Sequence, residues 1–118
     1  AHRPQIDQIA RRIVVSWRTR TPVRSVLLVG HTDSAGRDQY NLNLGCRRAQ
    51  ATRNQLLAAI QRLNPALIQQ LRFVIDSRGE REPATTEQSA QARTRNRRVV
   101  ITLSTASTLP APSASCSL

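Results

Sequence analysis

The chain has 118 residues, 39% of them hydrophobic, a length that fits a single hydrophobic core. Its formal net charge is +11, and all 18 basic residues are arginine, so the chain is expected to attract polyanions. Only 3% of the residues are aromatic, which argues against the base-stacking platform of a single-strand nucleic-acid binder, and no apolar run approaches the about 20 residues that cross a bilayer.

The residue pattern of the N-terminal third predicts a helix followed by a buried strand. Ile6, Ile9, Ile13 and Trp17 recur at helical spacing, which predicts an amphipathic helix over residues 5–18. Residues 21–22, Thr-Pro, end it. Residues 25–29 are a strand that is apolar nearly throughout, so we expect it to be central in its sheet and covered on both faces.

A polar loop over residues 34–43, with Gly36, Asp38 and Asn41, is expected next. A long helix follows, and we expect one side of it to carry the buried residues Ala49, Thr52, Leu56, Ile60 and Leu63. Residues 64–65, Asn-Pro, interrupt this helix, and residues 66–70 can form one more turn. Residues 73–75 predict a second strand, parallel to the first because a helix connects them.

The last third predicts a connection, one strand and a tail. Residues 77–95 are polar and read as a long connection, with a short helical piece at residues 87–92. Val99, Ile101 and Leu103 alternate with Val100 and Thr102, as in a half-buried strand. Ser, Thr, Ala and Pro then dominate. We therefore predict one domain over residues 1–103 and a flexible tail over residues 104–118.

The titratable residues do not form a recognisable metal or catalytic pattern. Cys46 and Cys116 are 70 residues apart without the spacing of a metal or redox site, and the sequence leaves open whether they pair. His31 has no Ser or Cys partner in a nucleophile motif, and His2 lies at the terminus. The sequence therefore predicts no enzyme, no metal and no cofactor.

One acidic and one basic residue stand out around the predicted loop. Asp33 follows the first strand, at the end of a sheet where ligands of α/β proteins bind. Arg48 is expected about one turn into the next helix, so the two charges could face one crevice and receive a zwitterion. Taken singly, each has a simpler interpretation: Asp33 as the start of a turn, and Arg48 as one solvated arginine among 18.

These residues belong to a longer pattern. It consists of Gly30-His31-Thr32-Asp33, Gly36, Tyr40-Asn41, Leu44-Gly45, Arg48-Ala49 and Asn96-Arg97-Arg98-Val99. The pattern resembles the OmpA-like peptidoglycan-binding domain of outer-membrane proteins, peptidoglycan-associated lipoproteins and flagellar stator proteins, over roughly residues 6–103. Gly45 departs from the family's usual Ser, which would remove a helix-capping hydroxyl. Residues 77–83 keep only Gly79 and Glu80 of the family's glycine-flanked turn.

The resemblance implies an α/β (α+β) fold, a βαβαβ sandwich with a mixed sheet and helices packed on one side. It implies non-covalent binding of the peptidoglycan stem peptide through its diaminopimelate, without catalysis, in a periplasmic module of a Gram-negative envelope. The site residues it implies are Asp33, Arg48, Thr32, Gly36, Asn41 and Arg97. Strand alternation alone does not say whether Arg97 or Arg98 faces the crevice.

Partners and parent architecture are less constrained. Peptidoglycan is the implied partner, and attachment to the outer membrane would run through a segment outside this sequence; no specific nucleic acid is expected, and a homodimer is left open. The alternative function is non-specific binding of a polyanion, nucleic acid or anionic lipid, by the arginines, which would fall steeply with salt. Whether the parent protein is a barrel, a lipoprotein or a stator stays open.

Overall fold

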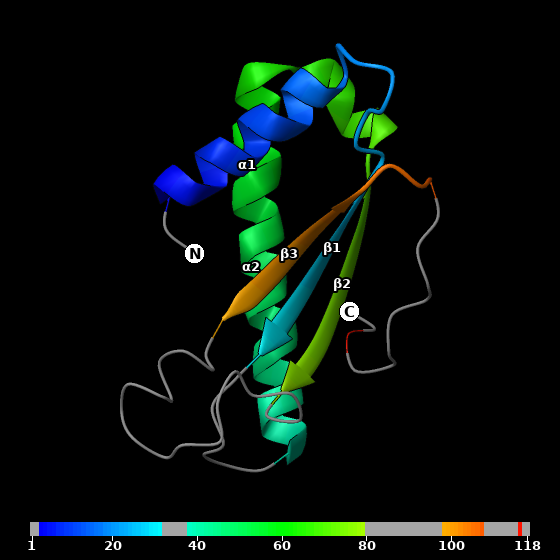
Figure 1. Cartoon of the computed structure of the whole chain (residues 1–118). Helices are drawn as coiled ribbons and strands as arrows, with labels where there is room; N and C mark the ends of the chain where they lie inside the picture. The colour runs from blue at the N-terminus through cyan, green and yellow to red at the C-terminus, as the bar shows by residue number, and fades with distance from the viewer. Residues whose placement is uncertain (1–2, 32–37, 80–97, 108–115, 117–118) are drawn as a thin grey trace.

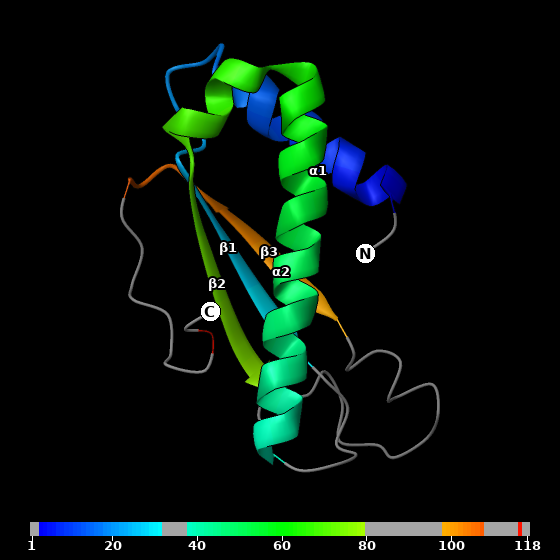
Figure 2. The same cartoon turned by 180° about the vertical axis from the view of Figure 1, so that it is seen from behind.

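A computed structural model describes residues 3–31, 38–79, 98–107 and 116. The chain forms a three-stranded sheet with helices packed on one of its faces (Figures 1 and 2). In chain order the elements are α1 (Arg3–Ser16), β1 (Ser25–His31), α2 (Asp38–Leu63), the 3-10 helix η1 (Pro65–Gln70), β2 (Arg72–Gly79) and β3 (Val99–Ser104). The α+β class and the one-sided packing of the helices are therefore confirmed.

The sheet is mixed, in the order β2-β1-β3. Strand β1 pairs parallel to β2, with Ser25 opposite Arg72, and antiparallel to β3, with Ser25 opposite Ser104. The predictions of a central first strand and a parallel second strand are confirmed. Both β1 and β2 are longer than predicted, because their carboxyl ends continue through the polar residues His31 and Ser77.

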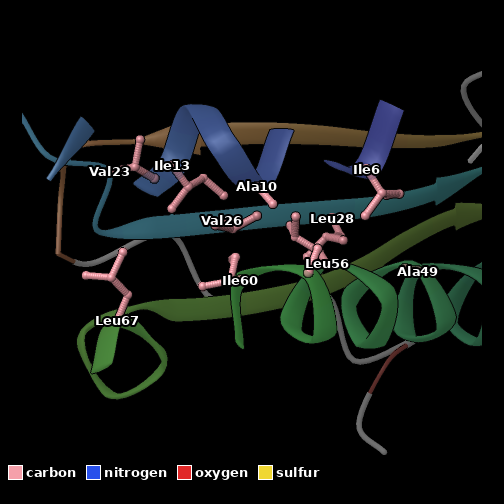
Figure 3. Packing of buried hydrophobic residues seen from close by; sticks show 11 residues of the cluster. Ile6, Ala10, Ile13, Val23, Val26, Leu28, Ala49, Leu56, Ile60 and Leu67 are labelled. Atoms are coloured by element: carbon pink, nitrogen blue, oxygen red, sulfur yellow. The ribbon is translucent and has the colours of Figure 1, made fainter. Parts of the chain in front are cut away.

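The core lies between the sheet and the two long helices (Figure 3). Strand β1 contributes Val26 and Leu28, both fully buried, while Leu27 and Val29 alternate with them on the other face and are only half-buried. The expectation that β1 is covered on both faces is thus only half met. The remaining buried hydrophobic residues of the cluster are Ile6, Ala10, Ile13, Val23, Ala49, Leu56, Ala59, Ile60 and Leu67.

Helix α1 follows its predicted amphipathic pattern and ends at a hydrogen-bonded corner. The Ser16 hydroxyl donates to the Ile13 carbonyl (2.6 Å) and accepts from the Val23 amide (2.9 Å). The Trp17 indole Nε1 donates to the Val23 carbonyl oxygen (2.9 Å). The guanidinium of Arg24 lies over the Trp17 ring, 5.4 Å from its centroid. Short polar contacts therefore fix the direction in which the chain enters β1.

Three predictions for α2 are wrong. The helix begins at Asp38, so residues 38–43 are helical rather than part of a loop, and Arg48 lies almost three turns into the helix rather than one. Leu63, expected on the buried side, is 48% exposed. Leu63 is the last residue of α2, and the chain then turns into η1, whose Leu67 is buried instead. The additional turn expected at residues 66–70 is confirmed as part of η1.

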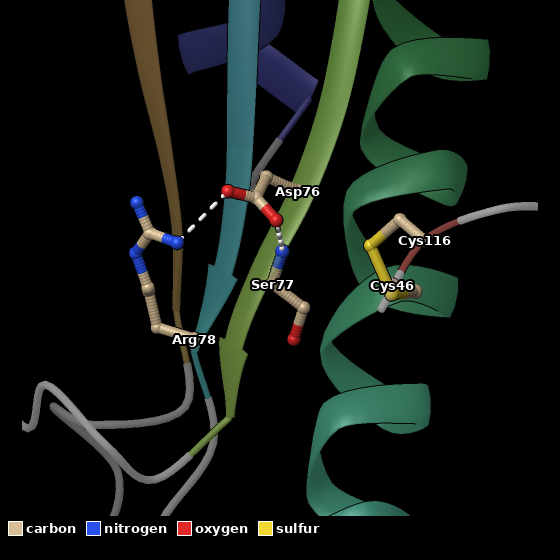
Figure 4. A network of polar contacts seen from close by, with 5 residues as sticks. All are labelled: Cys46, Asp76, Ser77, Arg78 and Cys116. Atoms are coloured by element: carbon tan, nitrogen blue, oxygen red, sulfur yellow. Dashed lines mark hydrogen bonds and ion pairs between the residues drawn. A yellow bond between two sulfur atoms is a disulfide. The ribbon is translucent and has the colours of Figure 1, made fainter. Parts of the chain in front are cut away.

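The two cysteines are joined in a disulfide (Figure 4). Cys46 lies on α2 and is 1% exposed, and its Cα is 5.4 Å from that of Cys116. The pairing that the sequence left open is thus resolved. The division into a domain and a flexible tail stays a prediction, although β3 includes Ser104 and Cys116 is tied to α2.

Candidate functional site

One side of α2 carries Asn41 and Arg48, the two residues of the candidate site that the structure describes, together with Thr52. Asn41, Arg48 and Thr52 recur at intervals of seven and four residues, so they form one stripe along the helix. Asn41 and Thr52 are buried, at 1% and 5% exposure, and Arg48 is half-buried. The stripe begins beside the carboxyl end of β1, where the motif Gly30-His31-Thr32-Asp33 starts.

A glycine contact sets the distance between this stripe and the sheet. A Cβ on Gly30 would overlap the backbone of Gly45, and a Cβ on Gly45 would overlap the Ser77 hydroxyl. Helix α2 can therefore approach β1 and β2 this closely only because both positions lack a side chain. A side chain at position 45 could not cap the start of α2. The helix begins at Asp38, so Gly45 lies about two turns inside it. Gly45 serves close packing next to Arg48.

Arg48 holds a donor without an acceptor. Its Nη1 is buried and has no hydrogen-bond partner among the residues that the structure describes. Its backbone carbonyl accepts a hydrogen bond from the Thr52 hydroxyl (3.0 Å), a local contact within α2. A guanidinium carries five N–H donors in a rigid fork, and a buried donor left unsatisfied costs about 1–3 kcal/mol. Arg48 is therefore suited to receive an anionic ligand.

Asn41 occupies a different place from the one predicted. It lies in the first turns of α2, where a loop was expected, and it is 1% exposed. Its neighbour Tyr40 is 56% exposed, which excludes a role for that ring in the core. Its buried amide makes a polar contact, as buried amides generally do, at the start of α2 next to the motif.

The other residues of the predicted site lie outside the described part of the chain. They are Thr32, Asp33, Gly36 and Arg97. Their attachment points are described: residues 32–37 join the end of β1 to the start of α2, and both ends lie at the same edge of the fold (Figure 1). The predicted helical piece at residues 87–92 also lies outside the described residues.

Arg98 can be placed relative to the helices. Its amide donates to the His31 carbonyl (3.2 Å), and the His31 amide donates to its carbonyl (2.7 Å), so β1 and β3 pairing continues to this residue. Val99, opposite Gly30, packs against the core on the helix side. Because side chains alternate along a strand, Arg98 belongs to the face away from α2. Arg98 is therefore not a neighbour of the α2 stripe, and Arg97 lies outside the described residues.

Sequence reasoning missed a polar cluster at the carboxyl end of β2 (Figure 4). An Asp76 oxygen accepts a hydrogen bond from the Ser77 amide (2.8 Å), and its other oxygen lies 3.0 Å from Nη1 of Arg78. Asp76 and Ser77 are 5% and 2% exposed. The sequence signal for a longer strand was the alternation of Asp76 and Arg78, but these residues lie in a polar stretch whose composition is typical of a loop. Burial and charge pairing let β2 extend through this stretch.

The described ranges contain neither a metal-binding cluster nor a membrane-spanning helix. In residues 3–31, 38–79, 98–107 and 116, no three His, Cys, Asp or Glu side chains come together as a metal site would require. Within the same part of the chain, none of the helices combines the length and apolar character of a membrane span.

The structure thus defines a small α+β domain with a half-buried arginine on a helix beside the end of its central strand. Residues 1–97 match the family model described as "OmpA family". The chain belongs to the OmpA family. This assignment confirms the resemblance seen in the motifs.

Curated relatives match parts of the chain. It is 42% identical over 74 residues to the peptidoglycan-associated lipoprotein of Pseudomonas aeruginosa, covering 63% of this chain and 40% of the relative. It is 29% identical over 99 residues to outer membrane protein A of Bordetella avium, covering 84% of this chain and 45% of the relative. The chain therefore spans less than half the length of either relative.

Solved structures share the fold. The peptidoglycan-associated lipoprotein from Burkholderia pseudomallei aligns with a TM-score of 0.65 at 27% identity, over 86% of this chain and 75% of that one. The C-terminal domain of Helicobacter pylori MotB aligns with a TM-score of 0.63 at 26% identity, over 86% of this chain and 70% of that one.

Proposed function

We propose that this chain is a periplasmic, envelope-associated module that binds peptidoglycan non-covalently and anchors its parent protein to the cell wall. Membership of the OmpA family and the similarity to peptidoglycan-associated lipoproteins support the proposal. Binding of this kind requires no catalytic group and no cofactor. The membrane or complex that is anchored would be joined through parts of the parent protein outside this sequence.

The ligand group we propose is the free end of diaminopimelate in the stem peptide. That end carries an ammonium and a carboxylate on one carbon. Asp33 would bind the ammonium, and the planar fork of Arg48 would bind the carboxylate through two parallel hydrogen bonds. Backbone amides of the loop with Thr32 and Gly36 would add contacts, and Arg97 would contribute a second positive charge. Asn41 would hold the start of α2 in place.

The observation that carries this proposal is the unsatisfied donor on Arg48. In a solvated arginine, every N–H donor can form a hydrogen bond to water. In Arg48, by contrast, Nη1 is buried and has no hydrogen-bond partner in the described part of the chain. The close contact of Gly45 with Gly30 holds the helix at this place beside the motif. Our proposal is that this donor faces the end of β1, where Asp33 follows two residues after the strand.

The test compares two neighbouring arginines on one helix. Arg48→Ala should weaken co-sedimentation with purified diaminopimelate-type sacculi by about tenfold or more, since a charge-assisted hydrogen bond contributes about 1.5–3 kcal/mol. Arg47→Ala is the matched control, because Arg47 is exposed and its loss changes the net charge equally. Equal binding by the two variants, with both folded by circular dichroism, would exclude Arg48 from the site.

Wall chemistry provides a second test. Lysine-type sacculi keep the ammonium but lack the terminal carboxylate, so they should bind about 5- to 150-fold less tightly. Asp33→Ala should abolish binding to diaminopimelate-type sacculi. Both comparisons need moderate salt, which screens the attraction of the +11 charge for any anionic polymer.

The competing function is polyanion binding, and one surface favours it. Arg24 and Arg72 are exposed where β1 and β2 begin, at the other end of these strands from the proposed site, and Arg18 and Arg20 are exposed in the segment between α1 and β1. Binding through this surface would fall steeply with salt and would not depend on Arg48. Equal affinity for both wall types at moderate salt would favour this function.

A further inference from the structure

A cavity lies on the other side of α2 from Arg48. It is open to solvent, has a volume of about 320 Å³ and is lined by residues of α2, the outer strand β2 and the disulfide-bonded Cys116. Its lining includes Gln50, Arg53, Arg72, Phe73 and Ile75. Cys46, Gln50 and Arg53 recur at intervals of four and three residues, so the disulfide and the cavity share one stripe of the helix. One stripe of α2 therefore carries Arg48, and another stripe lines the cavity.

The cavity is positively charged. Arg53 comes from α2 and Arg72 from the start of β2, and none of the described residues that line the cavity is acidic. The two guanidinium groups make no ion pair with any residue in the described ranges. Like charges brought together on one cavity repel each other, and an anion between them would remove that repulsion.

Arg53 presents a buried donor at this place. Its Nε is buried and has no hydrogen-bond partner among the described residues. Its Nη2 donates to the side-chain oxygen of Asn54 at 3.3 Å, a contact at the exposed surface. The Nε–H is thus held in the structure without an acceptor, which a bound oxygen atom would provide.

The cavity also has an apolar side. Phe73 and Ile75 are half-buried and pair in register with Val26 and Leu28, so they share the helix-facing side of the sheet. A purely inorganic anion would leave these side chains without contacts. A ligand that carries a small apolar group next to its charge would contact both sides of the cavity.

We propose that this cavity binds a carboxylate carried on a small apolar group, such as the terminus of a peptide. The Nε–H of Arg53 donates to one carboxylate oxygen, Arg72 neutralises the charge, and Phe73 and Ile75 contact the apolar group. This second site does not depend on the proposed peptidoglycan site, since Arg48 lies on the other stripe of α2.

The test uses three small probes and the arginine side-chain signals in nitrogen-15 NMR spectra of the whole chain. N-acetyl-leucine supplies a carboxylate and an apolar group, N-acetyl-leucinamide lacks the charge, and inorganic phosphate lacks the apolar group. We expect N-acetyl-leucine to shift the Nε–H signal of Arg53 saturably, and N-acetyl-leucinamide to leave it in place. Phosphate should bind more weakly than N-acetyl-leucine.

Variants locate the binding. Arg53→Gln should weaken N-acetyl-leucine binding about tenfold, because it removes one charge-assisted hydrogen bond. Arg72→Gln should weaken it less. Arg47→Gln, an exposed arginine on the same helix, should leave it within about twofold, since surface charge contributes little. Chemical shifts of the backbone would verify that each variant is folded.

Two results would overturn the proposal. One is a shift that grows linearly with N-acetyl-leucine and is matched by phosphate, which would indicate non-specific attraction to the net charge. The other is equal binding by the Arg53→Gln and Arg47→Gln variants. Sacculus binding by Arg53→Gln should stay normal, so this failure would be distinguishable from failure of the proposed peptidoglycan site.

Discussion

Removal of the Cys46–Cys116 disulfide is expected to lower the free energy of unfolding by less than the length of the loop it closes would suggest. The bond closes a loop with a sequence separation of 70 residues. By chain entropy, opening such a loop in the unfolded state should cost about 4 kcal/mol of stability. That figure assumes that the folded state is the same with and without the bond.

The folded state should also gain freedom when the bond is removed. The chain is held at Ala106, whose carbonyl accepts a hydrogen bond from the Ser25 hydroxyl (2.6 Å). Without the bond, the chain after Ala106 loses its covalent attachment to α2. Closing a loop of about 10 residues costs about 2.5 kcal/mol, which the folded state recovers. The net loss should therefore be between about 1.5 and 2 kcal/mol.

The measurement is urea denaturation of Cys116→Ser beside the oxidised chain, followed by circular dichroism. Cys116 is the better position to change, because Cys46 is 1% exposed and a hydroxyl there would be buried. A reductant should lower the free energy of unfolding of the original chain by the same amount and leave the variant unchanged. A loss of about 4 kcal/mol or more would refute the release of the segment, and no loss would refute the loop-entropy reasoning.

Three further variants test the packing. Gly30→Ala should lower the free energy of unfolding by about 2–3 kcal/mol, because its Cβ would overlap the Gly45 backbone; urea denaturation would measure this, and a neutral change would contradict the close contact. Leu28→Ala should cost about 3–4 kcal/mol in the same assay, since Leu28 is fully buried, and a cost below 1 kcal/mol would place it outside the core. Trp17→Phe should cost about 1 kcal/mol by removing the hydrogen bond to the Val23 carbonyl, with the melt followed by circular dichroism; an unchanged melt would show that water replaces the indole.

The strands were predictable because their apolar periodicity matches their burial. Val99, Ile101 and Leu103 alternate in the sequence and pack against the core on one face, as expected. The start of α2 was missed because Asp38, with the asparagines and glycines around it, has the composition of a loop. A helical pattern was nevertheless present, because three apolar residues recur at intervals of four and three. They are Leu42, Cys46 and Ala49, and all three are buried.

The candidate site was predictable in part. The position of Arg48 on a helix after the motif followed from the sequence, but its half-buried state and its unsatisfied donor depend on how closely α2 approaches β1. That approach is set by Gly30 and Gly45 together, and no local pattern indicates that two glycines so far apart in sequence touch. The disulfide was unpredictable for the same reason, because only the fold brings Cys46 and Cys116 within bonding distance.

The position of the disulfide also orders the events of folding during synthesis. Cys116 follows all three strands along the chain, whereas its partner lies in the helix between the first two. Since the chain emerges from its N-terminus, β1, α2 and β2 can associate before the second cysteine exists. Oxidation can therefore join the two cysteines after the sheet has assembled. We expect that a shortage of oxidant would shorten the lifetime of the folded domain more than it would lower the yield of folding.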